Sequence, residues 1–273
     1  MAIPKGLEPT GVILVDKPAG PSSFAVLAGV RSRTGAKTGH AGTLDPFATG
    51  LLILLSGRAT TMASCFVGLP KRYLADVDLS CRTTTGDPEG DALESHDVPS
   101  AGSLDAALES LRGEIELPIP TASAVKIGGE RAYKLHRKGV AVEMPLRRSR
   151  VDALDVIAYT PGIATLDLRV SSGTYVRSIA DALGGHCVSL RRTEVGPFSV
   201  EEADAEHVVS LDEALGRIGM TVAQAEAERR QKAAADRKAG EARKAAEAAR
   251  ADGAADATSG APQRAERERG MVG

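Results

Sequence analysis

Residues 151–170 read VDALDVIAYTPGIATLDLRV, and this stretch decides the fold class. Apolar and polar side chains alternate over residues 151–159 and again over residues 164–170, a period that is typical of half-buried β-strands. The Pro161-Gly162 pair between the two runs is a turn signal. The stretch therefore predicts a pair of antiparallel strands joined by a short turn.

The sequence on either side of this hairpin adds further strands and helices. Short apolar or alternating runs predict strands, whereas capping residues and helical spacing predict helices. In chain order these are a strand at 12–15, a helix from Ser22 and Ser23 to Gly35, a strand at 51–55, a helix at 58–66, a strand at 71–80, helices at 104–111, 130–139 and 174–185, and closing strands within 186–200. Because strands follow one another as often as they alternate with helices, the chain is predicted to be α+β, with a mixed, largely antiparallel central sheet flanked by helices.

The composition is that of a globular protein without export signals. Of its 273 residues, 42% are hydrophobic and 26% are charged, which suffices for a substantial core. Cys65, Cys81 and Cys187 form no CxxC pair and no signal-like segment opens the chain, so we expect a cytoplasmic location without disulfides or structural zinc. The longest apolar run, 51–55, is far shorter than the roughly 18 residues of a membrane span, so no membrane partner is expected.

The last part of the chain differs in kind from the rest. From Ala225 onward alanine and charged residues dominate, with 11 Lys or Arg and 9 Asp or Glu. Such a sequence favours helix but offers no apolar stripe to dock it, so we expect a solvated helix that becomes disordered after Gly253. The predicted organisation is a globular domain over residues 1–224 and a low-complexity tail over residues 225–273. The domain has more acidic than basic residues, so a nucleic-acid partner would have to bind a local basic patch.

Two loops contain clustered polar residues. Residues 39–50, GHAGTLDPFATG, place Asp45 before a proline and among glycines, which leaves room for a ligand to approach. From spacing alone, the commoner interpretation is a glycine-rich turn in which Asp45 is a turn or cap residue. Residues 83–99 are polar and acidic and predict an exposed loop with a short hairpin; the order of their glycine and acids does not fit a calcium loop. No cluster has metal-ligand spacing, so no metal is expected.

Several separated motifs resemble one family. DKPAGPSS and GHAGTLDPFATGLL are followed in order by GRATTMASCFVGLPKRY, TASAVKIGGERAYKLHRKG, SSGTYVRSIADALG and SLRRTEVGPF. These motifs, which span residues 11–198, resemble the bacterial tRNA pseudouridine-55 synthase family of the TruB type. The resemblance implies the pseudouridine synthase fold, tRNA as a partner bound through its T arm, and a reaction without metal or organic cofactor. In that reaction a T-loop uridine is detached from its ribose, rotated and reattached through carbon 5.

The resemblance also implies roles for individual residues. Asp45 matches the family's catalytic aspartate, and Arg177 matches the arginine that pairs with it. Tyr73 matches the aromatic residue that stacks on the target base. Because that base is stacked inside folded RNA at the start, the enzyme must flip it into a pocket at a cost of a few kcal/mol.

Further positions match residues around the pocket and the RNA. Tyr175 and Leu190 match residues near the base, and His40 matches a histidine that helps to extrude it. Lys17, with Pro18, matches a motif that supports the active-site loop, and a packing role and an RNA contact are both open for it. The cations that are candidates for phosphate contacts are Lys126, Arg131, Lys134, Arg137 and Lys138, then Arg147, Arg148 and Arg150, and finally Arg191 and Arg192.

The chain departs from the family pattern in two places. Thr61 stands where relatives usually have a lysine. The sequence after Phe198 predicts one helix and the tail but no full PUA domain, the small RNA-binding domain of many relatives. These departures leave a second function open, namely a tRNA-binding or folding protein without turnover. Asp45, Tyr73 and Arg177 favour the enzyme, and a monomer is the default for an enzyme that must embrace a folded RNA arm.

Overall fold

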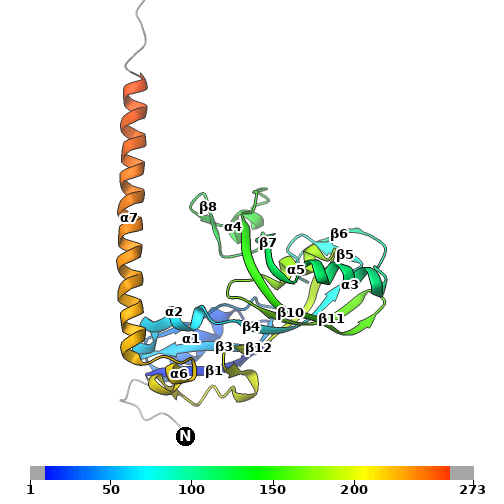
Figure 1. Ribbon diagram of the computed structural model, residues 1–273, viewed down its shortest axis with the longest axis horizontal. Helices are drawn as coiled ribbons and strands as arrows, with labels where there is room; N and C mark the ends of the chain where they lie inside the picture. The colour runs from blue at the N-terminus through cyan, green and yellow to red at the C-terminus, as the bar shows by residue number, and fades with distance from the viewer. Residues whose placement is uncertain (1–9, 259–273) are drawn as a thin grey trace, which may run out of the picture. The chain divides into compact units, whose positions relative to one another are not determined.

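The computed structural model describes residues 10–258, and its centre is one mixed sheet (Figure 1). The strand order along the sheet is β14-β1-β3-β12-β4-β11-β10-β7, with β2 paired to β3 and β13 paired to β12. The strands are β1 (Gly11–Lys17), β2 (Thr38–His40), β3 (Thr49–Ser56), β4 (Lys71–Asp78), β7 (Gly113–Pro118), β10 (Leu146–Thr160), β11 (Ile163–Val170), β12 (His186–Val195), β13 (Phe198–Ser199) and β14 (Val209–Ser210). Only β3 and β12 pair in parallel among these described strands, so the predicted mixed, largely antiparallel sheet is confirmed.

The hairpin that suggested the fold class is present as β10 and β11. Tyr159 pairs with Ala164 and Val151 with Val170, so the two alternating runs lie opposite one another. β10 begins earlier than its alternation predicts, because residues 146–151 pair with β7 on the other side. The alternation within residues 151–159 does not reveal this partner strand, so the sequence could not predict the longer β10.

Helices cover both faces of the sheet. Ser22 caps α1 (Ser23–Thr34) by accepting a hydrogen bond from the Ala25 amide at 3.2 Å, and Gly35 ends it at φ 68°, as expected. The other helical segments are η1 (Gly57–Met62), α2 (Ala63–Val67), α3 (Ala101–Ser110), α4 (Ala132–Arg137), α5 (Val176–Ala182), η2 (Val200–Glu202) and α6 (Leu211–Arg217). Two small hairpins, β5 (Cys81–Thr83) with β6 (Ala92–Ser95) and β8 (Lys126–Ile127) with β9 (Glu130–Arg131), lie outside the main sheet.

Strand register shows which residues share a face of the sheet. Lys17 pairs with Gly50, Gly50 with Arg192, and Arg192 with Tyr73, and paired residues point to the same side. Val15 and its partner Leu52 lie two residues further along and therefore share that face. α1 packs there, because it belongs to one apolar cluster with Val15 and Leu52. The same face continues past α1 to the β4–β12 half of the sheet, where Tyr73 and Leu190 belong to a second apolar cluster with residues of α3 and α5.

The end of the chain differs from its prediction in two ways. The division into two units falls after Ala225, which is buried in one apolar cluster with residues of α6 instead of belonging to the tail. α7 (Val222–Thr258) continues past Gly253, since one glycine costs an alanine-rich helix only about 1 kcal/mol. The rest of the disorder predicted after Gly253 falls on residues 259–273, which lie outside the described residues.

No helix within residues 10–258 is both long enough and apolar enough to cross a membrane.

Candidate active site

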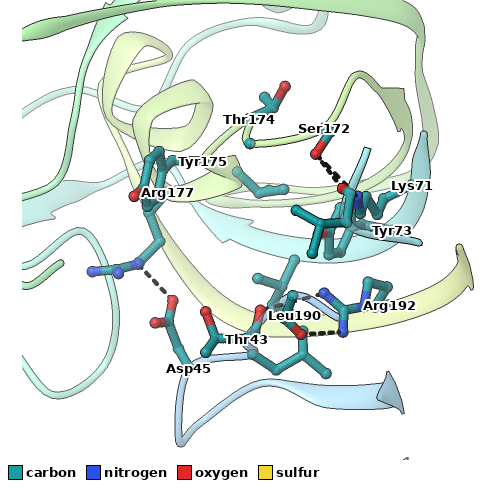
Figure 2. A pocket seen from close by; sticks show the side chains of 15 residues that line it. Thr43, Asp45, Lys71, Tyr73, Ser172, Thr174, Tyr175, Arg177, Leu190 and Arg192 are labelled. Atoms are coloured by element: carbon teal, nitrogen blue, oxygen red, sulfur yellow. Dashed lines mark hydrogen bonds and ion pairs between the residues drawn. The ribbon is translucent and has the colours of Figure 1, made fainter. Parts of the chain in front are cut away.

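A cavity of about 190 Å³ opens on the face of the sheet shared by β4 and β12 (Figure 2). Tyr73 of β4 and Leu190 of β12 rise from the sheet, and the β11–α5 connection with Ser172, Thr174 and Tyr175 forms the opposite side. The loop between β2 and β3 closes the remaining side and contributes Asp45. Five of the sequence-predicted site residues thus come together, although up to 145 positions separate them: Asp45, Tyr73, Tyr175, Arg177 and Leu190.

Lys17 holds the Asp45 loop from inside the protein. Its side chain is fully buried, and its ammonium donates hydrogen bonds to the carbonyls of Pro18 at 2.9 Å, Pro46 at 3.0 Å and Ala48 at 2.6 Å. No phosphate can reach an ammonium that is enclosed in this way. Of the two roles left open for Lys17, the structure therefore supports packing, and its assignment as an RNA contact is corrected.

Arg192 holds the same loop from the β12 side. Its guanidinium is buried and donates to the carbonyls of Leu51 at 2.7 Å, Gly42 at 3.2 Å and Thr43 at 3.3 Å. Gly50 permits the backbone of Arg192 to lie this close to the loop, because a Cβ at position 50 would lie 2.2 Å from the Arg192 carbonyl oxygen. The φ of Gly50, +99°, also favours glycine. Arg192 is thus a structural residue at the edge of the pocket, and its interpretation as an exposed phosphate contact is wrong.

Arg177 joins two carboxylates. Its side chain, only 3% exposed, places Nε 3.0 Å from Asp45 Oδ2 and Nη1 3.1 Å from Asp87 Oδ2. The remaining donors reach the carbonyls of Thr85 at 2.8 Å and Ala122 at 3.0 Å. A planar guanidinium with a partner at each of its three nitrogens has a fixed orientation, so Arg177 in turn fixes the Asp45 carboxylate (Figure 2).

Asp87 is an exception to the prediction that residues 83–99 form an exposed loop with a short hairpin, which β5 and β6 supply. Its carboxylate is buried and accepts hydrogen bonds from the Thr85 hydroxyl at 2.6 Å and the Glu89 amide at 3.0 Å, besides its ion pair with Arg177. Residues beyond it in the loop, such as Glu89 and Asp91, are exposed. A single acidic residue in a polar segment carries no signal of burial, because the partner that stabilises it lies on a distant helix.

Asp45 has opposing influences on its pKa. Burial raises the pKa of the carboxyl above its usual range, and the negative charge of Asp87 adds to this; Arg177 and Lys17 lower it, but burial prevails. The side chain keeps 37% of its surface exposed, and that surface faces the pocket. A substrate in the pocket would remove the remaining water from Asp45 and make its ionisation costlier. The ion pair with Arg177 offsets part of that cost.

Tyr73, Leu190 and Tyr175 supply the apolar surface of the pocket. Tyr73 and Leu190 are buried, on the face of the sheet that carries Arg192. Burial raises the pKa of the Tyr175 hydroxyl, so this group is a neutral hydrogen-bonding group. A flat base between such side chains would exchange water for stacking contacts.

We expect Tyr73→Leu to lower kcat/KM on an RNA substrate by about 10- to 100-fold, whereas Tyr73→Phe should retain more activity because it preserves the flat ring. Steady-state kinetics of both variants measure this difference. Equal activity of the Phe and Leu variants would contradict a stacking role for Tyr73.

His40 lies outside the lining of the pocket. It sits at the end of β2, where it pairs with Leu54 of β3, and its buried Nδ1 atom has no hydrogen-bond partner within the described residues. Burial lowers the pKa of its imidazole, and the charge of Arg192 lowers it further. His40 is therefore a neutral ring near the Asp45 loop, and its role toward RNA stays a prediction.

Lys71 is a pocket residue that the sequence analysis missed. Its side chain is buried and donates to the carbonyls of Val67 at 2.6 Å and Leu69, and to the Ser172 hydroxyl at 3.2 Å. It thereby ties the end of α2 to the β11–α5 connection, two segments that border the pocket. The alternation of the strand could have identified Lys71, since it precedes the inward-facing Tyr73 by two residues and therefore points to the same side of the sheet.

Burial, with a smaller contribution from Arg192, lowers the pKa of Lys71 from 10.5 to about 8. Between these values the unfolded chain binds a proton that the folded protein does not, so Lys71 makes the free energy of unfolding rise with pH, by about 2 kcal/mol from pH 8 to 9.5. In urea unfolding across this range, the free energy of unfolding of wild type should rise by that amount relative to that of Lys71→Met. Lys126→Met, at an exposed lysine, should behave like wild type, and parallel curves for wild type and Lys71→Met would contradict the prediction.

The other predicted RNA-contact residues lie outside the pocket lining. Lys126, Arg131, Lys134 and Arg137 are exposed on the β8–β9 hairpin and α4, as are Lys138, Arg147, Arg148 and Arg150 nearby in sequence. Some of these have partners: Lys138 pairs with Glu130 at 2.7 Å, and the Arg137 guanidinium lies 5.7 Å from the Tyr133 ring centre. Arg191 is half-buried and pairs with Asp16 at 2.8 Å. Thr61, in η1, donates its hydroxyl to the Arg58 carbonyl at 2.8 Å.

Within residues 10–258, no group of His, Cys, Asp and Glu side chains is arranged to hold a metal ion. The chemistry of the pocket is that of one carboxylate, its arginine partner and the aromatic and apolar side chains around them.

Two solved complexes share this fold. A chain in the crystal structure of a Cbf5-Nop10-Gar1 complex superposes with a TM-score of 0.53 at 29% identity, covering 73% of this chain and 56% of that chain. A chain in the structure of an H/ACA RNP bound to a substrate RNA containing 2'-deoxyuridine gives 0.51 at 27% identity, with 70% and 49% covered. The fold and the carboxylate pocket on its sheet define a pseudouridine synthase.

Residues 31–176 match the family described as "TruB family pseudouridylate synthase (N terminal domain)", and the chain belongs to this family. It is 41% identical over 252 residues to a tRNA pseudouridine synthase B of Mycobacterium sp. (strain KMS). The aligned region covers 82% of this chain and 84% of that protein. The tRNA pseudouridine synthase B of Corynebacterium efficiens is 41% identical over 243 residues, with 81% and 82% covered.

Proposed function

We propose that this protein isomerises uridine 55, in the T loop of tRNA, to pseudouridine. The observation that carries the proposal is the Asp45–Arg177 ion pair at the mouth of a small pocket lined by Tyr73 and Leu190. A cavity of about 190 Å³ is smaller than the roughly 300–1,000 Å³ of pockets for drug-sized ligands, which favours a single base. The sequence relatives named tRNA pseudouridine synthase B support tRNA as the substrate.

In this proposal the target nucleotide leaves the RNA stack and its base enters the pocket, where Tyr73 stacks on it and Leu190 contacts it. Asp45, oriented by Arg177, promotes cleavage of the bond between N1 of the base and C1′ of the ribose. The base rotates, C5 bonds to C1′, the proton on C5 is lost, and N1 gains a proton. Product and substrate have the same atoms and oxidation state, so the isomerisation consumes no redox partner.

The exposed cations of the β8–β9 hairpin and α4 are proposed to bind backbone phosphates, so that tRNA affinity falls as salt rises. Residues 1–224 are proposed as the catalytic domain, working as a monomer in the cytoplasm, with Ala225 added to it because it packs in the core. Residues from Glu226 onward are proposed as an extension without a part in the reaction.

The test is to incubate the purified protein with an unmodified tRNA transcript and to map pseudouridine by chemical labelling and primer extension. Modification confined to the T-loop uridine is the expected result. Binding of the transcript without any pseudouridine would overturn the proposal and favour a tRNA-binding or folding protein that retains the fold. Modification at another position would overturn the assignment of the substrate site.

A further inference from the structure

The aromatic residues of this chain are few, and one of them is placed unlike the rest. There are four phenylalanines, four tyrosines and no tryptophan, and all of them lie within the described residues. Phe24 is 71% exposed, whereas each of the other seven is buried or half-buried. An exposed aliphatic side chain is common on protein surfaces, but a phenylalanine ring in water presents a large flat apolar area without use in folding.

Phe24 is fixed close to the Asp45 loop through its backbone neighbours. The adjacent Ser23 is buried, and its hydroxyl both donates to the Leu44 carbonyl and accepts from the Leu44 amide, each at 2.8 Å. The Gly20 amide donates to the Pro46 carbonyl at 2.8 Å. Two anchors therefore join the start of α1 to the residues on either side of Asp45, so the backbone at Phe24 has a set position next to the Asp45 loop.

Phe24 also lies on the pocket side of the sheet. α1 packs with Val15 and Leu52 on the face that carries Tyr73 and Arg192 further along the sheet. Residues 18–22, which lead into α1, are exposed and carry no charge. Phe24 thus follows a short exposed segment without charge, next in the structure to the loop that carries Asp45.

We infer that Phe24 is a stacking platform for a second, unpaired nucleobase of the substrate RNA, next to the nucleotide that enters the pocket. This inference rests on the proposed function, since it takes RNA as the substrate. A flipped base leaves its neighbours without a stacking partner, and an exposed aromatic ring stacks on any base irrespective of sequence. The absence of charge in residues 18–22 before it favours a base over a phosphate as the group that meets the ring.

The test compares the affinity of purified wild type, Phe24→Ala and Phe24→Trp for an unmodified tRNA transcript at several salt concentrations. Ile157→Ala is the matched control, because Ile157 is also an exposed apolar residue, 57% exposed, but lies on β10. Phe24→Ala should weaken binding about 10-fold, with a salt dependence parallel to that of wild type, because stacking releases no counterions. Phe24→Trp and Ile157→Ala should bind like wild type, and all four proteins should melt at the same temperature.

Unchanged affinity of Phe24→Ala, or an equal loss in Ile157→Ala, would overturn the inference. A changed salt slope in Phe24→Ala would overturn it as well, since it would indicate altered phosphate contacts. If sedimentation shows a wild-type dimer that Phe24→Ala dissociates, the ring is a protein contact and the inference fails. The proposed function is judged separately, by pseudouridine formation in wild type, so a protein that binds tRNA without turnover still gives a result for Phe24.

Discussion

Asp45→Asn is expected to abolish pseudouridine formation, lowering the rate by at least about 10⁴-fold, while tRNA affinity stays within a few-fold of wild type. The amide is close in size to the carboxylate and fills the same place beside Arg177, so the loop held by Lys17 and Arg192 should keep its shape. What the variant lacks is the negative charge and the nucleophilic oxygen. Single-turnover assays with primer-extension mapping give the rate, and filter binding gives the affinity.

The matched control for this variant is Asp16→Asn, which removes a carboxylate that is paired with an arginine outside the pocket lining. It should retain activity close to wild type. Turnover by Asp45→Asn within 10-fold of wild type would remove Asp45 from its proposed role. Loss of tRNA binding by this variant would indicate a structural role for the carboxylate instead.

Asp87→Ala is expected to lower kcat by about 100-fold or more, although Asp87 lies outside the pocket lining. The variant leaves the Arg177 guanidinium with one carboxylate in place of two, and the 3.0 Å contact with Asp45 then has less to hold its orientation. Removing one partner of an ion pair this deeply buried also destabilises the protein, by about 3–5 kcal/mol. Rates are therefore compared at a temperature where thermal melting shows the variant to be folded.

Asp91→Asn is the control within the same loop, because Asp91 is exposed and has no ion pair with Arg177. It should change neither kcat nor the melting temperature. A kcat for folded Asp87→Ala equal to that of wild type would show that Arg177 is positioned well enough by its bonds to Thr85 and Ala122. A rise in KM with unchanged kcat would show that Asp87 acts on binding rather than on the orientation of Asp45.

Local sequence patterns were reliable wherever the physical cause is local. Alternation over residues 151–170 predicted the β10–β11 pair, and Ser22 and Gly35 predicted the two ends of α1. The motif resemblance brought Asp45, Tyr73 and Arg177 into one proposed site, and the structure places all three around the same pocket. Geometry from spacing alone would not have done so, because Asp45 by itself is more typical of a turn.

The failures have one cause in common. Lys17 and Arg192 were considered for RNA contact and Asp87 for an exposed loop, because an ionised side chain is normally found in water. Each is buried because atoms remote in the sequence satisfy it: loop carbonyls for Lys17 and Arg192, and the Arg177 guanidinium for Asp87. Lys71 escaped notice for the same reason, since its acceptors include Ser172 on another segment.

The sequence by itself determined the α+β class and the limits of most helices and strands, and its motifs predicted that Asp45 and Arg177 would be paired. These follow from periodicity, capping, composition and motif order, which are properties of neighbouring residues. Only the tertiary structure decided which charged groups are buried, which face of the sheet holds the pocket, and that Phe24 stands exposed on that face. Burial and orientation depend on which distant atoms supply the missing hydrogen bonds and apolar contacts, and those atoms are brought together only when the sheet forms.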